Sequence, residues 1–200
     1  MLAHGGLIGA AGWATADSAL PSHADVGAYY VAGTYSFSSP THTIQAAGYD
    51  VWSTADSFHY AYKTLSGDGT LVARVASVGG DYSDNGTKAG VMIRETLTAG
   101  SAHAFMGIAK GNGSELVYRP STDGVSSAAA GSAVSPPYWT KLVRSGNSFS
   151  AYHSANGTDW TQVGTTVTIG MATNVYAGIA LLGHYSSHLC IATLDGVSIP

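Results

Sequence analysis

Apolar and polar positions alternate with a period of two in many short runs of this sequence, and turn residues separate the runs. In Ser57–Leu65, Phe58, Tyr60 and Tyr62 fall on one face. Such alternation is typical of β-strands, in which successive side chains point to opposite sides of a sheet. The same reading predicts strands at Tyr29–Phe37, His42–Ala46, Thr70–Val78, Lys88–Glu95, Ala102–Ala109, Glu115–Arg119, Thr165–Ile169, Val175–Leu182 and Leu189–Ile199.

The stretch from Pro136 to Gly164 carries the clearest turn signals. A Ser-Gly-Asn loop separates Tyr138–Arg144 from Ser148–Ser154, and such a short Gly-containing loop predicts a hairpin. An Asn-Gly pair then reverses the chain before Trp160–Val163, because both residues tolerate positive φ. With similar signals roughly every 8–12 residues, we expect about a dozen strands in an all-β sandwich or barrel.

The remaining segments do not add a helix. Ser121–Ser135 is low in complexity and predicts an exposed loop or a ragged edge strand. Residues 1–20 are rich in Gly and Ala and read as a leader, a linker or an edge segment. We expect residues 21–200 to form a single domain, since sandwiches of this size often fold as one unit.

Composition narrows the function classes. Charged residues make up 10% of the chain, against roughly a quarter in ordinary proteins, and the net charge is −4. No basic run marks a nucleic-acid surface, and no apolar stretch is long enough to cross a bilayer. The single cysteine, Cys190, excludes an internal disulfide and a Cys-based zinc site. Its apolar neighbours predict a buried thiol in a strand.

Four segments together resemble a known group: GYDVWSTADSFHYAYKTLSGDGTLVARV, KAGVMIRE, YWTKLVRSGNSFSAYHSANGTDW and LCIATLDGVSI. They resemble the concanavalin A-like lectin/glucanase (laminin-G-like jelly-roll) domains of bacterial carbohydrate-active proteins. These include a domain-of-unknown-function group related to the yeast enolase-regulator protein. The likeness runs from about Asp25 to Ile199. It departs at Ser53, where the pattern often has Gly, and at Asn156, where it often has Asp.

The resemblance implies a two-sheet antiparallel β-sandwich that usually serves as an accessory carbohydrate-binding or adhesion module. It also implies a secreted or cell-surface location, as part of a larger multidomain protein. Three functions stay open at this point: a non-catalytic module that binds polysaccharide, a glycoside hydrolase or lyase on the same fold, and a structural or adhesion module. The first is our leading hypothesis.

Catalytic residues are scarce. Glycosidases need two carboxylates at a fixed separation, and the chain has only two glutamates, Glu95 and Glu115, neither in a Glu-x-Asp-x-x-Glu motif. If the protein is an enzyme, Asp56 and Glu95 are the candidate pair. The His, Tyr and Arg that a lyase would use are present without a recognised spacing. No Gly-x-Ser-x-Gly elbow supports a serine hydrolase.

Sugar recognition requires aromatic rings together with a few fixed polar groups. We expect Arg74 and Arg94 to point outward on one concave face. Trp52, Trp139 and Trp160 are instead expected in the core or beneath turns. The full set of candidate ligand-binding residues is Arg74, Arg94, Tyr82, Tyr118, Arg119, His153 and Tyr185.

A structural calcium ion is the one cofactor that the sequence suggests. Asp25 and Asp195 could supply oxygen ligands if the first and last strands pair, although both could simply cap turns. His184 and His188 lie four residues apart in what reads as a strand end and a loop, which does not favour zinc.

Overall fold

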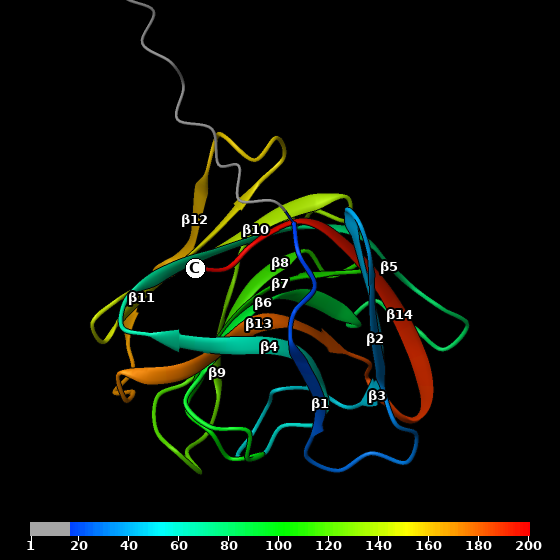
Figure 1. The fold of residues 1–200 in the computed structure, drawn as a ribbon, viewed down its shortest axis with the longest axis horizontal. Coiled ribbons are helices and arrows are strands. Elements are labelled where there is room, and N and C mark those ends of the chain that lie inside the picture. Colours follow the sequence, from blue (N-terminus) through cyan, green and yellow to red (C-terminus); the bar gives the residue numbers. More distant parts are fainter. Residues whose placement is uncertain (1–16) are drawn as a thin grey trace, which may run out of the picture.

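The computed structural model describes residues 17–200, which fold into two packed β-sheets (Figure 1). The described strands, in chain order, are β1 (Ser22–Val26), β2 (Thr34–Ser38), β3 (Thr41–Gly48), β4 (Phe58–Ser66), β5 (Gly69–Gly79), β6 (Lys88–Arg94), β7 (His103–Ala109), β8 (Ser114–Arg119), β9 (Ser127–Ala130), β10 (Tyr138–Ser145), β11 (Ser148–Ser154), β12 (Thr161–Thr168), β13 (Asn174–Leu182) and β14 (Tyr185–Ser198).

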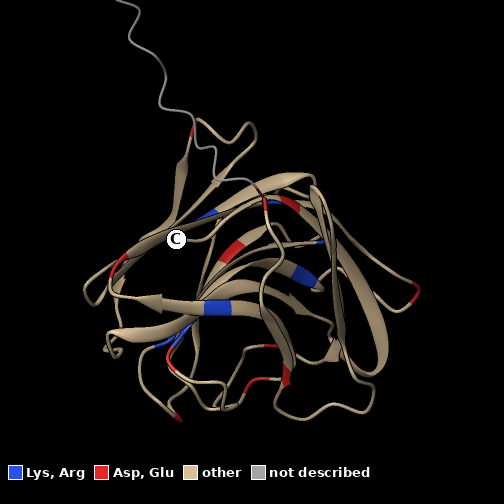
Figure 2. Cartoon of the chain, in the orientation of Figure 1, with Lys and Arg blue, Asp and Glu red and all other residues tan. Residues whose placement is uncertain are grey.

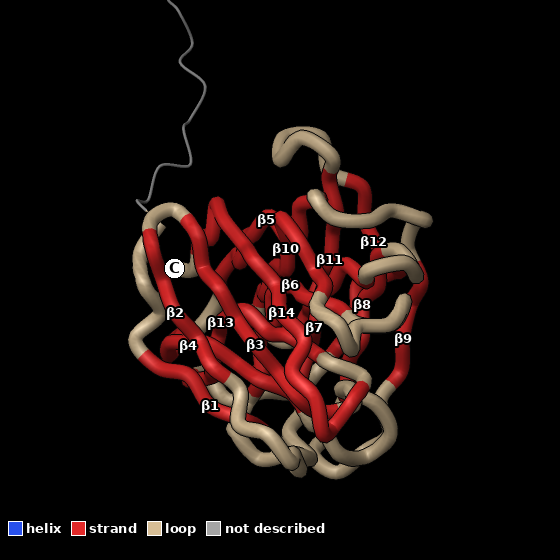
Figure 3. The backbone as a smooth tube through the Cα atoms, turned by 90° about the vertical axis from the view of Figure 1, so that its right-hand side faces the viewer, coloured by secondary structure: helices blue, strands red, loops and turns tan. Residues whose placement is uncertain are grey.

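Each sheet contains seven strands, and every pairing is antiparallel. Sheet A has the order β1-β4-β13-β6-β7-β8-β9, and sheet B has the order β12-β11-β10-β5-β14-β3-β2. Figure 3 shows strands and loops without a helix in the described part of the chain, so residues 17–200 hold no helix that could span a membrane. The expected all-β sandwich is confirmed.

The alternating side chains of the two sheets fill the space between them. Leu142 of β10, Val75 of β5 and Ile179 of β13 are fully buried there, together with inward-facing residues of the other central strands. The two strands that end the chain occupy central places, β13 in sheet A and β14 in sheet B. The core is therefore complete only when the C-terminal strands are in place.

The outer face of sheet A carries a second buried apolar cluster, which includes Phe58, Tyr60 and Phe105. The expected alternation in β4 is confirmed, because the ring centroids of Phe58 and Tyr60 lie 5.8 Å apart and those of Tyr60 and Tyr62 5.2 Å apart. Three loops that hydrogen-bond to one another, residues 49–57, 95–101 and 120–126, lie below this sheet in Figure 1.

Two elements differ from the sequence expectation, and the edge strand expected within Ser121–Ser135 is confirmed. The strand expected at Tyr29–Phe37 begins only at Thr34, and residues 27–33 form a loop. The runs around Trp160–Val163 and Thr165–Ile169 form one strand, β12, because Gly164 adopts a positive φ of 67° and forms a bulge instead of ending the strand. Ser121–Ser135 contains the short edge strand β9.

The N-terminal residues that the structure describes pack onto the sandwich. The Asp17 carboxylate accepts hydrogen bonds from the backbone N–H groups of Gly196 and Val197 at 2.9 and 3.0 Å, and Leu20 is buried in the core. The leader or linker expected at residues 1–20 falls largely outside the described residues. Cys190 is buried as expected, and burial raises the pKa of its thiol to about 12.

Candidate functional site

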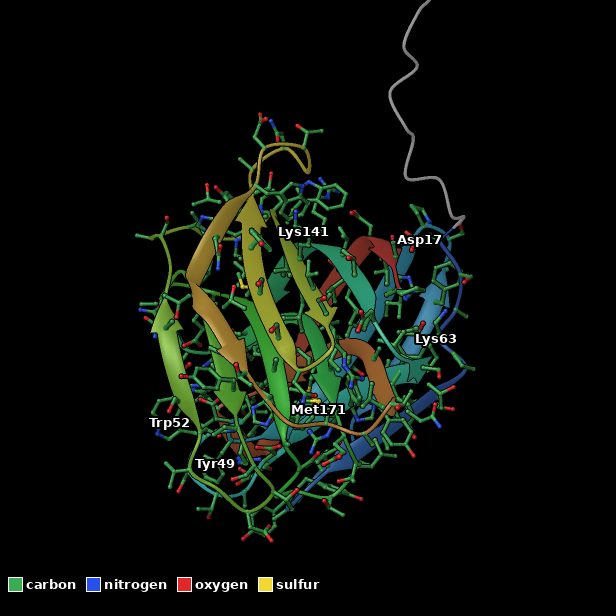
Figure 4. The ribbon with its side chains drawn as sticks, turned by 90° about the vertical axis from the view of Figure 1, so that its left-hand side faces the viewer. Asp17, Tyr49, Trp52, Lys63, Lys141 and Met171 are labelled. Carbon is green, nitrogen blue, oxygen red and sulfur yellow. The ribbon has the colours of Figure 1, made fainter. Side chains whose placement is uncertain are left out.

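A groove of about 390 Å³ crosses the outer face of sheet B. We call it the tryptophan groove, because Trp139 and Trp160 lie on its walls with Lys141 between them in the sequence. Figure 4 shows Lys141 beneath the projecting loop that joins β11 to β12. The lining residues are Thr70, Val72, Trp139, Lys141, Val143, Asn156, Gly157, Trp160, Gly196 and Ser198.

Strand register builds this groove. Lys141 on β10 lies opposite Tyr152 on β11 and opposite Val72 on β5, so the three side chains form a row across the sheet. Trp139 stands two residues earlier on the same face, opposite Arg74. The intervening positions of β10 point into the core, which is why the aromatic and cationic side chains must face outward.

Trp139 is fixed by close contact with the β11–β12 loop and with β14. Gly157 and Gly196 both adopt a positive φ, and a Cβ at either position would come within 2.9 and 2.6 Å of the indole ring. The expectation that this residue lies beneath a turn is therefore confirmed for Gly157. The other expected position, in the core, is wrong for Trp139 and Trp160, because both line the open groove. The alternation Trp139, Lys141, Val143 around Leu142 was the signal that could have revealed it.

Lys141 places a positive charge among aromatic rings. Its Nζ lies 4.2 Å from the ring centroid of Trp160 and 4.5 Å from that of Tyr152. Burial lowers the pKa of Lys141 below its ordinary value. Lys141 is the one charged residue among those that line the groove.

An ion pair borders the groove on its Trp139 side. The Arg74 guanidinium donates to both carboxylate oxygens of Asp195, from Nε at 2.7 Å and from a terminal nitrogen at 2.5 Å. The hydrogen bond to Asp195 raises the pKa of Arg74. The Arg74 side chain keeps 39% of its surface exposed, so this bidentate pair presents fixed polar atoms to a ligand.

The outer face of sheet A carries five linked charged side chains, which we call the ion-pair chain. Lys88 Nζ lies 2.5 Å from Glu115 Oε1 and 3.2 Å from Asp50 Oδ2. His184 continues the chain, with Nε2 3.2 Å from Asp50 Oδ2 and Nδ1 3.3 Å from Asp84 Oδ2. The Asp50 and Glu115 carboxylates thus face each other across one ammonium group.

Contacts among the members of the ion-pair chain shift their pKa values. Burial would raise the pKa of Asp50, but the hydrogen bond from His184 and the charge of Lys88 outweigh burial and lower it. The hydrogen bond to Asp50 raises the pKa of His184. Burial disfavours the charged form of Lys88, yet the two carboxylates raise its pKa. The ion-pair chain therefore favours an ionised Asp50 beside a protonated Lys88.

A second hollow of about 410 Å³ lies beside the ion-pair chain. Asp50 and Asp56 line it together with Tyr49 and Trp52, whose exposed fractions are 64% and 51%. Figure 4 shows these two aromatic residues at the opposite end of the molecule from Lys141. Trp52 is thus on the surface and not in the core, which was one of its two expected positions.

Asp56 belongs to a buried charge cluster. Its Oδ1 lies 2.6 Å from a terminal nitrogen of Arg119, and its Oδ2 lies 3.2 Å from Arg94 and 3.6 Å from His103. All four side chains have no exposed surface. Burial and the two guanidinium charges push the pKa of His103 well below its ordinary value.

This cluster overturns one expectation. Arg94 is enclosed on sheet A and donates to the backbone carbonyls of Thr96 and Thr98, whereas Arg74 lies on sheet B. The two arginines therefore do not share a concave face. Their apolar strand contexts are alike in sequence, and only the loops over sheet A distinguish them.

The other predicted residues are dispersed. Tyr82 stacks on His188 with ring centroids 3.7 Å apart, and Tyr185 is 43% exposed. His153 is buried, with Nδ1 2.8 Å from Ser114 Oγ, and Tyr118 packs against the core between the sheets. Glu95 accepts a hydrogen bond from the Ala172 N–H at 2.9 Å. Apart from Arg74, none of them borders the tryptophan groove.

The proposed calcium ligands have other partners. Asp25 on β1 lies 2.8 Å from His59 Nδ1 and accepts from the Gly33 N–H, whereas Asp195 on β14 binds Arg74. β1 pairs with β4 and β14 with β3 and β5, so the expected pairing of the first described strand with the last is wrong. Within residues 17–200, no cluster of three or more His, Cys, Asp or Glu side chains is arranged to hold a metal.

Comparison with known proteins places this fold among described architectures. No family model matches the sequence, and no curated protein matches it. A functionally unknown protein from Saccharomyces cerevisiae matches with a TM-score of 0.65 and 18% identity, over 84% of this chain and 91% of that one.

Two further solved structures match the fold. The carbohydrate-binding module CBM66 from Bacillus subtilis matches with a TM-score of 0.53 and 14% identity, over 84% and 91% of the two chains. The GH43 protein BlXynB from Bacillus licheniformis matches with a TM-score of 0.55 and 14% identity, over 78% of this chain but 32% of that one. The chain thus has a concanavalin A-like jelly-roll fold. Membership of the enolase-regulator-related group stays a prediction.

Proposed function

We propose that this protein is a non-catalytic carbohydrate-binding module and that its glycan lies across the tryptophan groove. The groove supports this assignment because Trp139 and Trp160 offer apolar ring surface to pyranose faces. The Arg74–Asp195 pair, Asn156 and Ser198 surround that surface with polar groups for sugar hydroxyls. The likeness in fold to a carbohydrate-binding module agrees with it. We further propose that the module belongs to a secreted or cell-surface protein.

Binding without turnover is favoured because the carboxylates nominated for catalysis are engaged elsewhere. Asp56 is enclosed by two arginines, and Glu95 binds a backbone N–H. A glycosidase needs one carboxyl group that holds a proton near neutral pH. Among the described residues, Asp50 faces Glu115 across Lys88, and pairing with His184 and Lys88 lowers the pKa of Asp50, which favours its ionised form.

Replacement of one tryptophan tests the proposal. Trp160→Ala removes a ring from the groove, and we expect affinity for a binding polysaccharide to fall about tenfold or more. Trp52→Ala is the matched control, since Trp52 is also exposed but lies at the other end of the molecule. Affinity electrophoresis or calorimetry against a polysaccharide panel measures both. Equal losses in the two variants, or no binding of the unmodified protein, would contradict the proposal.

A hydrolase is the second candidate, and the facing carboxylates of Asp50 and Glu115 are the observation in its favour. Retaining glycosidases hold their two carboxyl groups roughly 5–5.5 Å apart. Release of reducing or unsaturated sugars by the unmodified protein, lost in Glu115→Gln, would establish this candidate instead.

A further inference from the structure

We propose that the tryptophan groove selects glycans that carry a carboxylate, such as uronic acid polymers, and that Lys141 Nζ binds that carboxylate. This inference rests on the proposed function and names its ligand class. It follows from the position of Lys141 in the groove. There, the Lys141 ammonium group forms no ion pair with a carboxylate of residues 17–200.

The acidic groups around Lys141 leave its charge available to a ligand. Among residues 17–200, no carboxylate forms an ion pair with Lys141, whereas Lys88 on sheet A binds two carboxylates and Arg74 binds one. Acidic side chains next to groove residues are engaged with other donors. Asp159 accepts from Asn156 Nδ2 at 2.7 Å. Asp17, near the Gly196 rim, accepts from two backbone N–H groups.

The aromatic contacts hold the ammonium group in place without neutralising it. Cation–π attraction keeps Nζ between the rings of Trp160 and Tyr152, yet neither ring carries a formal charge. A carboxylate on a sugar whose apolar face covers a tryptophan would complete an ion pair there. In a groove partly shielded from water, such a charge-assisted bond is stronger than one between neutral partners.

The charge of the whole molecule does not provide this preference. The net charge is −4, so long-range electrostatics disfavour a polyanion. Figure 2 shows the few charged residues scattered over both sheets, with no broad basic surface. Selection for an acidic glycan must therefore come from a local contact.

The test compares three carboxylate polymers (polygalacturonate, alginate and hyaluronate) with three neutral ones (xylan, galactan and mixed-linkage glucan). Calorimetry at low salt measures the unmodified protein, Lys141→Met and Lys63→Met. Methionine keeps the unbranched apolar stem of lysine and removes its charge. Lys63 on β4 provides the same change of charge away from the groove (Figure 4).

We expect at least one carboxylate polymer to bind about tenfold or more tightly than every neutral polymer. Lys141→Met should abolish that preference, and Lys63→Met should keep it. If neutral polymers bind best and Trp160→Ala abolishes their binding, the inference fails while the proposed function stands. An equal loss in Lys63→Met would also overturn it, and no binding of any polymer would overturn both.

Discussion

At single residues, the backbone can adopt a conformation that the side chain disfavours, and Ser53 is an example. Ser53 adopts a φ of 57°, which lies in the left-handed region that favours glycine. The Ser53 carbonyl accepts hydrogen bonds from the Ser126 N–H at 2.8 Å and from Arg119 at 3.3 Å, so the conformation closes the loops over sheet A.

We predict that Ser53→Gly stabilises the protein. A non-glycine residue pays about 1–2 kcal/mol for the left-handed conformation, and glycine pays about 0.5–1 kcal/mol in lost chain entropy. The net gain in free energy of unfolding should reach up to about 1 kcal/mol, as measured by chemical denaturation. Ser53→Ala is the control and should give no gain, because it keeps the Cβ. A destabilised glycine variant would contradict this account.

His184 gives the fold a pH dependence of known sign. Its pKa is higher in the folded chain than in the unfolded chain, because the charged form binds Asp50 and Asp84. Its stabilising contribution is therefore present below about pH 6.5 and is lost as the pH rises through its folded-state value. Asp50 has a lowered pKa, so its contribution is lost as the pH falls through its folded-state value.

We predict that His184→Asn, which tolerates the positive φ of 62°, costs more free energy of unfolding at pH 5 than at pH 8. Denaturation of both proteins at the two pH values measures the difference and cancels the effect of other histidines. An NMR titration should also give His184 a pKa above 6.5 that falls in Asp50→Asn. A cost that does not vary with pH would show that the ring acts by packing alone.

Between neighbouring strands, the space available for a side chain restricts the residue type as strongly as the apolar pattern does. Gly178 lies in the middle of β13, and a Cβ there would overlap with the carbonyl oxygen of Ala61 on β4. Gly79, near the end of β5, has no atom within 4 Å of the corresponding position. Gly178 therefore permits the close spacing of β13 and β4, whereas Gly79 has free space beside it.

We predict that Gly178→Ala lowers the free energy of unfolding by about 1–3 kcal/mol, because the added methyl group overpacks the sheet. Gly79→Ala should change it by less than about 0.5 kcal/mol. Denaturant unfolding of both variants gives the comparison. Equal effects would mean that loss of glycine flexibility, and not contact with Ala61, controls stability.

Across the whole molecule, the order of strands within each sheet decides which strands can join the sheet only through another strand. β14 ends the chain but lies between β5 and β3, so the β2–β3 hairpin joins sheet B only through β14. We predict that a chain ending at residue 184 has no cooperative thermal transition by circular dichroism and is digested rapidly by proteases. Removal of Pro200 alone should leave the transition unchanged. A folded truncated chain would show that the hairpin does not need its central partner.

The sequence by itself determined the strands, because period-two alternation and turn residues are local properties. It predicted the two-sheet class, most strand positions and the buried state of Cys190. The sequence prediction was wrong at Gly164, which forms a bulge within β12 and does not end a strand. A glycine can end a strand or bend it, and the local sequence does not distinguish the two.

Only the tertiary structure decided which residues meet. Arg74 and Arg94 occupy similar strand contexts, but cross-strand pairing leaves the first beside Trp139 and the loops over sheet A enclose the second. The tryptophan groove combines one continuous stretch, β10 to the β11–β12 loop, with β5 and β14, which are distant from that stretch in sequence. Long-range register sets such contacts, and short-range pattern does not encode it.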